Sequence, residues 1–227
     1  MIFVVDGNVG SGKSSLIYNI CEYLVMLVGR DNVAVVEQPD ILPRCHNNTL
    51  QFHINALFAM HSSEREAVRL SESGKLVLME SVRYTLGPAL AELTDITEQD
   101  KDIFKSLCER YPPLLGGDYK DYFRLFLDTP AHVCLARIRT RGRQADEHVT
   151  KKFLEALTRN LERTRGMLIE AEPLRMAIVD GSVLWEKPMS VKVRRHVDSD
   201  HCSDYDYQET FLAELFISLV PHNLRIK

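Results

Sequence analysis

The 227-residue sequence lacks the patterns that mark several large classes of protein. No apolar run approaches the roughly 20 residues that a membrane-spanning helix needs, and the N-terminal MIFVVDGN has neither the charged flank nor the length of a signal peptide. Cations are not in excess, since 28 Lys and Arg stand against 32 Asp and Glu, which argues against a general nucleic-acid binder. We therefore expect neither a membrane nor a nucleic acid as a partner.

A framework of disulfide bonds is also missing. The five cysteines are odd in number and irregularly spaced, and no CxxC pair occurs. Such cysteines are typical of the cytosol, where thiols are kept reduced. We predict a cytoplasmic protein.

The composition is that of one globular domain. Hydrophobic residues make up 45% of the chain and charged residues 26%. A chain of this length buries roughly 70% of its unfolded surface, so it needs no disulfide or metal to fold. We expect residues 1–227 to form a single domain.

Short apolar runs alternate with amphipathic stretches along the chain. This alternation predicts an α/β fold, in which a parallel central sheet is flanked by helices on both faces. The stretch 186–207 mixes charges, serines and histidines and is expected to be an extended loop. The expected strands are 2–5, 33–36, 76–79, 122–127 and 176–179, and the expected helices are 13–28, 49–70, 98–109, 129–139, 150–171 and 208–220.

A glycine-rich turn joins the first expected strand to the first expected helix. Its sequence GNVGSGKS fits GxxxxGK[ST], in which successive main-chain N–H groups and the helix N-terminus bind phosphates. We expect Lys13 to reach the β- and γ-phosphates of a nucleoside triphosphate, and Ser14 to ligate Mg²⁺. The absence of an NKxD signature counts against a GTPase. The predicted phosphate site comprises Gly7, Asn8, Val9, Gly10, Ser11, Gly12, Lys13, Ser14 and Ser15.

Two carboxylates stand at the ends of expected strands. Glu80 follows one strand and Asp128 ends another, so either could hold the metal at the carboxyl edge of the sheet. Either could equally cap the helix that follows it.

Four arginines then crowd together between residues 137 and 143, with no carboxylate before Asp146. Such crowding costs energy unless an anion neutralises it, and planar guanidinium groups suit phosphate. We interpret 137–147 as an arginine-rich lid over the transferred γ-phosphate, with a solvated surface charge run as the alternative.

These motifs together resemble the deoxyribonucleoside kinases, the family of deoxycytidine kinase, mitochondrial thymidine kinase and the insect multisubstrate enzyme. The turn GNVGSGKSS is similar to the family's GNIGSGKS/T, and 126–143 resembles its strand, helix and arginine lid. Leu50-Gln51 looks like the family's LQT or FQS element. The resemblance covers residues 1 to about 165 and implies a P-loop kinase fold, ATP and Mg²⁺ as cofactors, a part in nucleotide salvage, and a homodimer.

The resemblance also implies roles for single residues. Gln51 would hydrogen-bond the nucleobase, although an amide on a helix is often only a surface group. Glu80 matches the start of the family's ERS motif and would assist the magnesium. Asp146 falls where the family contacts the sugar 3′-hydroxyl, with Glu147 as the neighbouring substitute. Arginines of the lid would clamp the phosphates, namely Arg137, Arg141 and Arg143.

The sequence departs from the family at two catalytic positions. The family's Glu-Pro pair reads Glu37-Gln-Pro here, and we take Glu37 as the general base, because a glutamine amide cannot accept the 5′-hydroxyl proton. An acidic residue that merely ends a strand is the alternative. The ERS motif reads Glu-Ser-Val, and Arg83, one helical turn on, is our candidate for the missing guanidinium. These departures suggest a divergent member, such as a viral thymidine kinase, which would act in the host cytoplasm.

The residues that follow Gln51 on its helix face suggest a base preference. Ile54 and Phe58 are apolar, whereas relatives that take deoxycytidine or purines have an arginine at the second position. An apolar wall accommodates a 5-methyl group. Our hypothesis is therefore transfer of the ATP γ-phosphate to the 5′-hydroxyl of thymidine or another pyrimidine deoxynucleoside. The alternatives are a thymidylate-type monophosphate kinase and a regulator that hydrolyses ATP slowly.

Overall fold

The computed structural model describes residues 1–37, 50–80, 96–116, 119–147, 149–171, 175–182 and 193–194. Arg83, the helix expected at 208–220 and most of the stretch 186–207 lie outside these residues. Among the described helices, none is both long and apolar enough to cross a bilayer.

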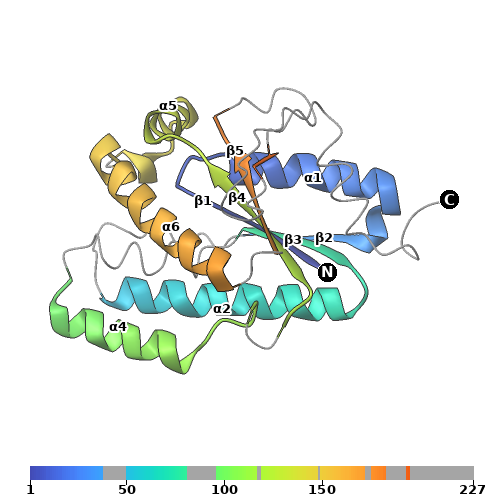
Figure 1. Cartoon of the computed structure of the whole chain (residues 1–227), viewed down its shortest axis with the longest axis horizontal. Helices are drawn as coiled ribbons and strands as arrows, with labels where there is room; N and C mark the ends of the chain where they lie inside the picture. The colour runs from blue at the N-terminus through green and yellow to red at the C-terminus, as the bar shows by residue number, and fades with distance from the viewer. Residues whose placement is uncertain are drawn as a thin grey trace.

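Strands and helices alternate along the chain at nearly the expected positions (Figure 1). The strands are β1 (Ile2–Gly7), β2 (Val33–Val36), β3 (Leu76–Glu80), β4 (Tyr122–Asp128), β5 (Met176–Asp180) and β6 (Val193–Arg194). The α-helices are α1 (Lys13–Val28), α2 (Leu50–Glu72), α4 (Glu98–Arg110), α5 (Ala131–Arg141) and α6 (Lys151–Ala171), and the 3₁₀ turns are η1 (Arg30–Asn32) and η3 (Gln144–Asp146).

The sheet has the order β2-β3-β1-β4-β5-β6, and its first five strands are parallel. This arrangement confirms the predicted α/β fold with a parallel central sheet. The prediction of a loop over 186–207 was wrong at β6, where Val193 and Arg194 pair antiparallel with β5. Because the first five strands run the same way, their carboxyl ends, where Gly7, Glu80 and Asp128 lie, meet at one edge.

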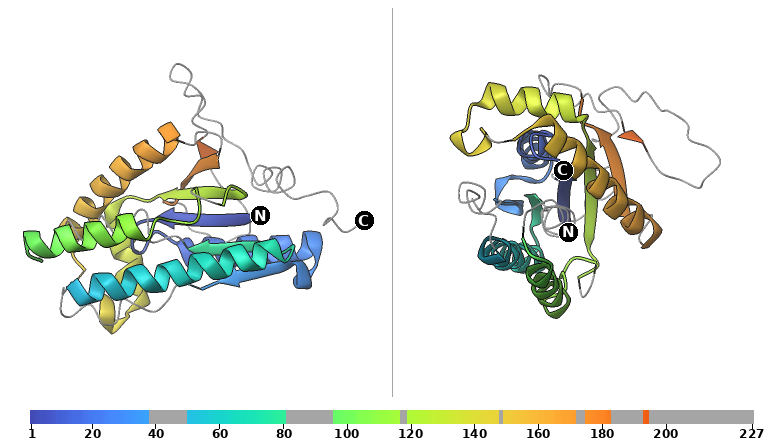
Figure 2. Two further views of the ribbon diagram at one scale, coloured as in Figure 1. Left: turned by 90° about the horizontal axis from the view of Figure 1, so that it is seen from below. Right: turned by 90° about the vertical axis from the view of Figure 1, so that its left-hand side faces the viewer.

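Helices cover both faces of the sheet because successive side chains of a strand point to opposite sides. One face packs Phe3, Val5 and Leu125 against the apolar stripe of α1. The other packs Ile2 and Val4 against α2, and α6 continues this layer beside β4. Figure 2 (right) shows α1, in blue, and α2, in cyan, on opposite sides of the strands. Helices therefore cover both faces of the sheet, and we expect the functional site at one of its edges.

A buried ion pair links the two central strands. Arg124 of β4 donates to the carboxylate of Asp6 in β1, and their side chains are only 2% and 0% exposed. The Arg124 guanidinium also lies 5.8 Å from the centre of the Tyr122 ring. Asp6 directly precedes Gly7, so this pair fixes the end of the strand from which the glycine-rich turn departs.

Replacing Arg124 with methionine should destabilise the protein, because it leaves the Asp6 carboxylate buried without its cation. We expect a loss of about 3–5 kcal/mol, measured by urea unfolding. Asp6→Asn combined with Arg124→Met is the matched control and should recover part of that loss, since no buried charge remains. Equal destabilisation by both would show that the ion pair is not what Arg124 contributes.

Candidate active site

The glycine-rich turn leads from β1 straight into α1. Ser11 N–H donates to the carbonyl of Asn8 over 3.1 Å, which closes the turn. The Lys13 ammonium lies across it, donating to the carbonyls of Gly7 at 3.3 Å and Asn8 at 3.0 Å. The cation expected to meet phosphate therefore lies at the turn itself.

Burial lowers the pKa of Lys13, and the nearby carboxylates of Glu80 and Asp6 partly oppose this effect. The cost of a buried ammonium falls when an anion comes close to it. A phosphate placed at the turn would supply that anion, so the site electrostatically favours a negatively charged ligand.

Ser14 and Glu80 form the part that suits a metal. The Ser14 hydroxyl donates to Glu80 Oε1 over 2.5 Å, and Glu80 lies beside Val5 in the sheet register. A hydroxyl and a carboxylate are the hard oxygen ligands that Mg²⁺ prefers, and Mg²⁺ needs few protein ligands when phosphates and water complete its shell. Asp128, the other candidate, instead lies 3.7 Å from the guanidinium of Arg165. The geometry therefore favours Glu80 over Asp128.

The side chain of Asn8 ties the turn to α6. Its amide nitrogen donates to Leu154 O at 3.0 Å and to Thr158 Oγ1 at 2.8 Å, while its oxygen accepts from Val9 N–H at 2.7 Å. Asn8 is buried, and every one of these contacts shapes the loop. The sequence pattern placed Asn8 at a variable position and gave no sign of this role or of Thr158.

Helix α5, which opens the lid, packs directly on the turn at Gly10. A Cβ at Gly10 would lie 2.7 Å from the carbonyl oxygen of Cys134 and 2.8 Å from Ile138. The Cys134 thiol is buried there, and burial raises its pKa to about 11 although the cations of Lys13 and Arg137 act against the rise. The glycine turn and the start of the lid are therefore in contact, as one phosphate site requires.

The lid arginines have three different environments. Arg137 donates to main-chain carbonyls of the turn and of the segment after β5. Arg141 donates to the buried carboxylate of Asp146 at 2.7 Å, and its charge is close enough to help lower the pKa of Lys13. Arg143 and Glu147 are exposed. The residues that we expected to bind phosphate and sugar, Arg141 and Asp146, are thus paired with each other.

Glu37 directly follows β2 and is exposed. Val36 pairs with Met79 in the sheet, so continuing the register places the main chain of Glu37 beside that of Glu80. The expected general base therefore lies at the same edge as the expected metal ligands.

The expected base-binding residues lie on α2 but are less closely tied to the turn. Gln51 is exposed and its amide donates to Asn55 at 2.8 Å. Phe58 is 43% exposed, and its ring lies 5.1 Å from that of Tyr111. Met60, on another side of α2, is in the same apolar cluster as Val9 of the turn. Among the described residues, the contacts given for Gln51 and Phe58 are with Asn55 and Tyr111 and not with the phosphate loop, and Ile54 is half-buried.

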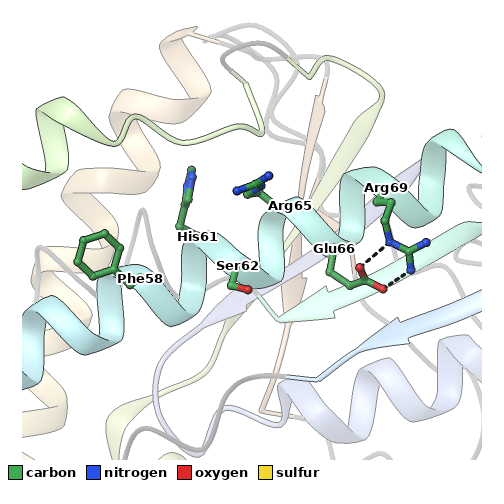
Figure 3. A pocket seen from close by; sticks show the side chains of 6 residues that line it. All are labelled: Phe58, His61, Ser62, Arg65, Glu66 and Arg69. Atoms are coloured by element: carbon green, nitrogen blue, oxygen red, sulfur yellow. Dashed lines mark hydrogen bonds and ion pairs between the residues drawn. The ribbon is translucent and has the colours of Figure 1, made fainter.

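Phe58 does line a cavity of about 550 Å³ along α2 (Figure 3). Ligand sites usually enclose most of their ligand. All the lining residues come from this one helix, so the described walls form an open groove. They are Phe58, His61, Ser62, Arg65, Glu66 and Arg69.

Comparisons with known proteins bear on the family and the fold of the chain. A family model described as deoxynucleoside kinase matches residues 3–202. No curated protein sequence matches the chain significantly.

Among solved structures, deoxyadenosine kinase from M. mycoides with dCMP and dCDP bound is similar, with a TM-score of 0.61 and 16% identity, over 81% of this chain and 92% of that one. The same enzyme with dATP bound has a TM-score of 0.60 and 14% identity, over 81% and 93% of the two chains. At this identity the likeness shows the fold.

The contact at Gly10 yields a prediction with a matched control. Gly10→Ala forces a Cβ into α5 at a φ of +74°, and should cost about 2–4 kcal/mol in unfolding free energy and weaken ATP binding. Gly142 has a similar φ of +65° but open space around it, so Gly142→Ala should cost only about 1 kcal/mol. Thermal unfolding of both variants measures the difference, and equal losses would contradict the close packing.

Proposed function

The chain belongs to the deoxynucleoside kinase family, and we propose that it transfers the γ-phosphate of ATP to the 5′-hydroxyl of thymidine or a related pyrimidine deoxynucleoside. One observation supports this most directly. The ammonium of Lys13, the Ser14–Glu80 pair and the arginine-bearing helix α5 all meet at one turn at the carboxyl edge of the sheet.

The residues divide the chemistry between them. Main-chain N–H groups of the turn and the Lys13 ammonium bind the β- and γ-phosphates and stabilise the charge that develops on them. Arg141 and Arg143 add cations from the lid. Ser14 and Glu80 would hold Mg²⁺, which would supply positive charge to stabilise the negative charge of the phosphates.

Proton removal from the 5′-hydroxyl is assigned to Glu37. Glu80 lies at the same edge, but its carboxylate accepts a hydrogen bond from the Ser14 hydroxyl. Glu80 is therefore assigned to the metal. Glu37 is exposed at the end of β2, where a nucleoside can reach it. A carboxylate so placed can take the proton while the hydroxyl oxygen attacks the γ-phosphorus and the bond to ADP breaks.

The substrate end of the site is proposed from residues that offer few polar contacts to a base. Gln51 would pair with the base edge, and Ile54 and Phe58 would form the apolar wall that suits a pyrimidine. Asp146 and Glu147 are the candidates for the sugar 3′-hydroxyl. In this proposal Asp146 exchanges its bond to Arg141 for the sugar, which frees Arg141 for phosphate.

A thymidylate kinase would need further cations to hold the phosphate of its acceptor, and a slow ATP-hydrolysing regulator would need no acceptor. Separate assays with thymidine, with its monophosphate and without acceptor distinguish the three activities. The proposal also includes a cytoplasmic homodimer, as the family resemblance implies, and gel filtration with light scattering measures the dimer.

Glu37→Gln should lower kcat about 10²- to 10⁴-fold, because the amide cannot accept the hydroxyl proton. The KM for ATP should stay within about 2-fold, and the melting temperature should not change, since Glu37 is exposed. Steady-state kinetics with thymidine measure both constants. Retention of full kcat would show that Glu37 is not the general base. The comparison variant is Glu80→Gln, which we expect to alter the Mg²⁺ requirement.

The base preference is tested by kcat/KM for thymidine, deoxycytidine and deoxyguanosine. We expect thymidine to be preferred, and Phe58→Arg to lower kcat/KM for thymidine about 10-fold or more, because it replaces an apolar wall with a charge. Phe58→Leu keeps the wall apolar and should lose less. A preferred purine in the wild-type enzyme would overturn the pyrimidine assignment while leaving the kinase activity intact.

A further inference from the structure

One guanidinium nitrogen of Arg137 donates hydrogen bonds to two main-chain carbonyls. Its Nη1 lies 2.8 Å from the carbonyl oxygen of Ser11, in the glycine turn, and 2.7 Å from that of Gly181, just after β5. Nη1 carries two hydrogens, so it serves both acceptors at once. The side chain is half-buried, unlike that of Arg143, which is exposed.

The Ser11 carbonyl has a second hydrogen-bond donor, which lies just beyond the end of β4. Thr129, directly after β4, donates its hydroxyl to the same oxygen at 3.2 Å. Gly181 N–H in turn donates to the carbonyl of Asp128 at 2.9 Å. The turn, the end of β4 and the segment after β5 are therefore joined in one hydrogen-bonded group, and Arg137 bonds to two of its three segments.

Holding this carbonyl fixes the orientation of the next N–H group. The bond between Ser11 and Gly12 is trans, so the Ser11 C=O and the Gly12 N–H point in opposite directions. With the oxygen held on the side of α5 and the end of β4, the Gly12 N–H points away from these two elements. In a P-loop, successive main-chain N–H groups of the turn bind phosphate.

We propose that Arg137 is a positioning residue that acts on phosphate through the Gly12 N–H, by fixing the Ser11–Gly12 peptide plane, and is not itself a phosphate ligand. This inference rests on the proposed function, because it needs a phosphate at the turn. It divides the arginine run in two. Arg137 belongs to the fixed floor of the site, and only Arg141 and Arg143, beyond it on the chain, act as the moving cations of the lid.

A positioning residue and a phosphate ligand differ in their effect on the stability of the ligand-free protein. A guanidinium whose only contact is with bound phosphate does not stabilise the ligand-free protein, and its removal relieves repulsion with the other cations. A guanidinium that bonds two carbonyls stabilises the ligand-free protein, because its removal takes one donor from the Gly181 carbonyl and leaves the Ser11 carbonyl with Thr129.

The first measurement is the melting temperature of the full chain without ligand. Arg137→Met should lower it by about 3–8 °C. Arg143→Met, which removes an exposed lid cation, should leave it within about 1 °C while weakening ATP binding. An unchanged melting temperature for Arg137→Met would overturn the proposal.

The second measurement is a double-mutant cycle on ATP binding with Mg²⁺ and without nucleoside, by calorimetry. Arg137→Met and Thr129→Val act on the same carbonyl, so each should weaken binding about 10-fold and the two together also about 10-fold. A product of about 100-fold would instead show independent action and assign Arg137 to the phosphate. Thr129 carries no charge, so it cannot imitate a phosphate ligand.

If Arg137→Met does not fold, Arg137→Lys keeps the charge but not the planar geometry that reaches both carbonyls. A melting temperature lowered in Arg137→Lys, with ATP binding weakened about 10-fold, supports the proposal. Wild-type behaviour of that variant overturns it. Wild-type protein that binds no ATP would overturn the proposed function as well, whereas wild-type binding with additive variants would overturn only the role of Arg137.

Discussion

The site depends on how the main chain of the glycine turn is held. Three elements bond or pack against it from different directions. Asn8 reaches α6, Gly10 touches α5, and the Ser11 carbonyl accepts from Arg137 and Thr129. A loop that binds phosphate through N–H groups must keep those groups turned inward without a ligand present, and these contacts keep it in one conformation. The conformational entropy of the loop is therefore lost when the protein folds and not when ATP binds.

The charges around the turn also favour the binding of an anion. Asp6 is neutralised by Arg124 deep in the sheet, whereas Lys13 lies at the edge and its burial lowers its pKa. A carboxylate that is already paired competes weakly for the lysine. Phosphate is therefore the anion best placed to complete the electrostatics of the turn, because Glu80 accepts from the Ser14 hydroxyl.

Much of the fold could be predicted from local patterns. The strand at 33–36 and the helix at 13–28 have the expected limits. The helix that begins at Glu98 starts where it was expected and ends one residue later, and Thr97 caps it by accepting from Asp100 N–H. These features depend on periodicity and capping within a few residues. β6 could not be predicted, since a strand of two residues is too short to leave a periodic signal. The open groove beside Phe58 depends likewise on which elements cover α2.

The sequence by itself determined the type of chemistry: the GxxxxGKS spacing specifies a phosphate loop wherever a strand meets a helix, because the backbone geometry follows from the glycines. It also showed that arginines follow the fourth strand. Only the tertiary structure decided what each of them does. Arg137, Arg141 and Arg143 are alike in the sequence, but one bonds to main-chain carbonyls, one to Asp146, and one faces solvent. The reason is that a guanidinium takes its role from the acceptors within about 3 Å of it, and those of Arg137, the carbonyls of Ser11 and Gly181, come from distant parts of the chain.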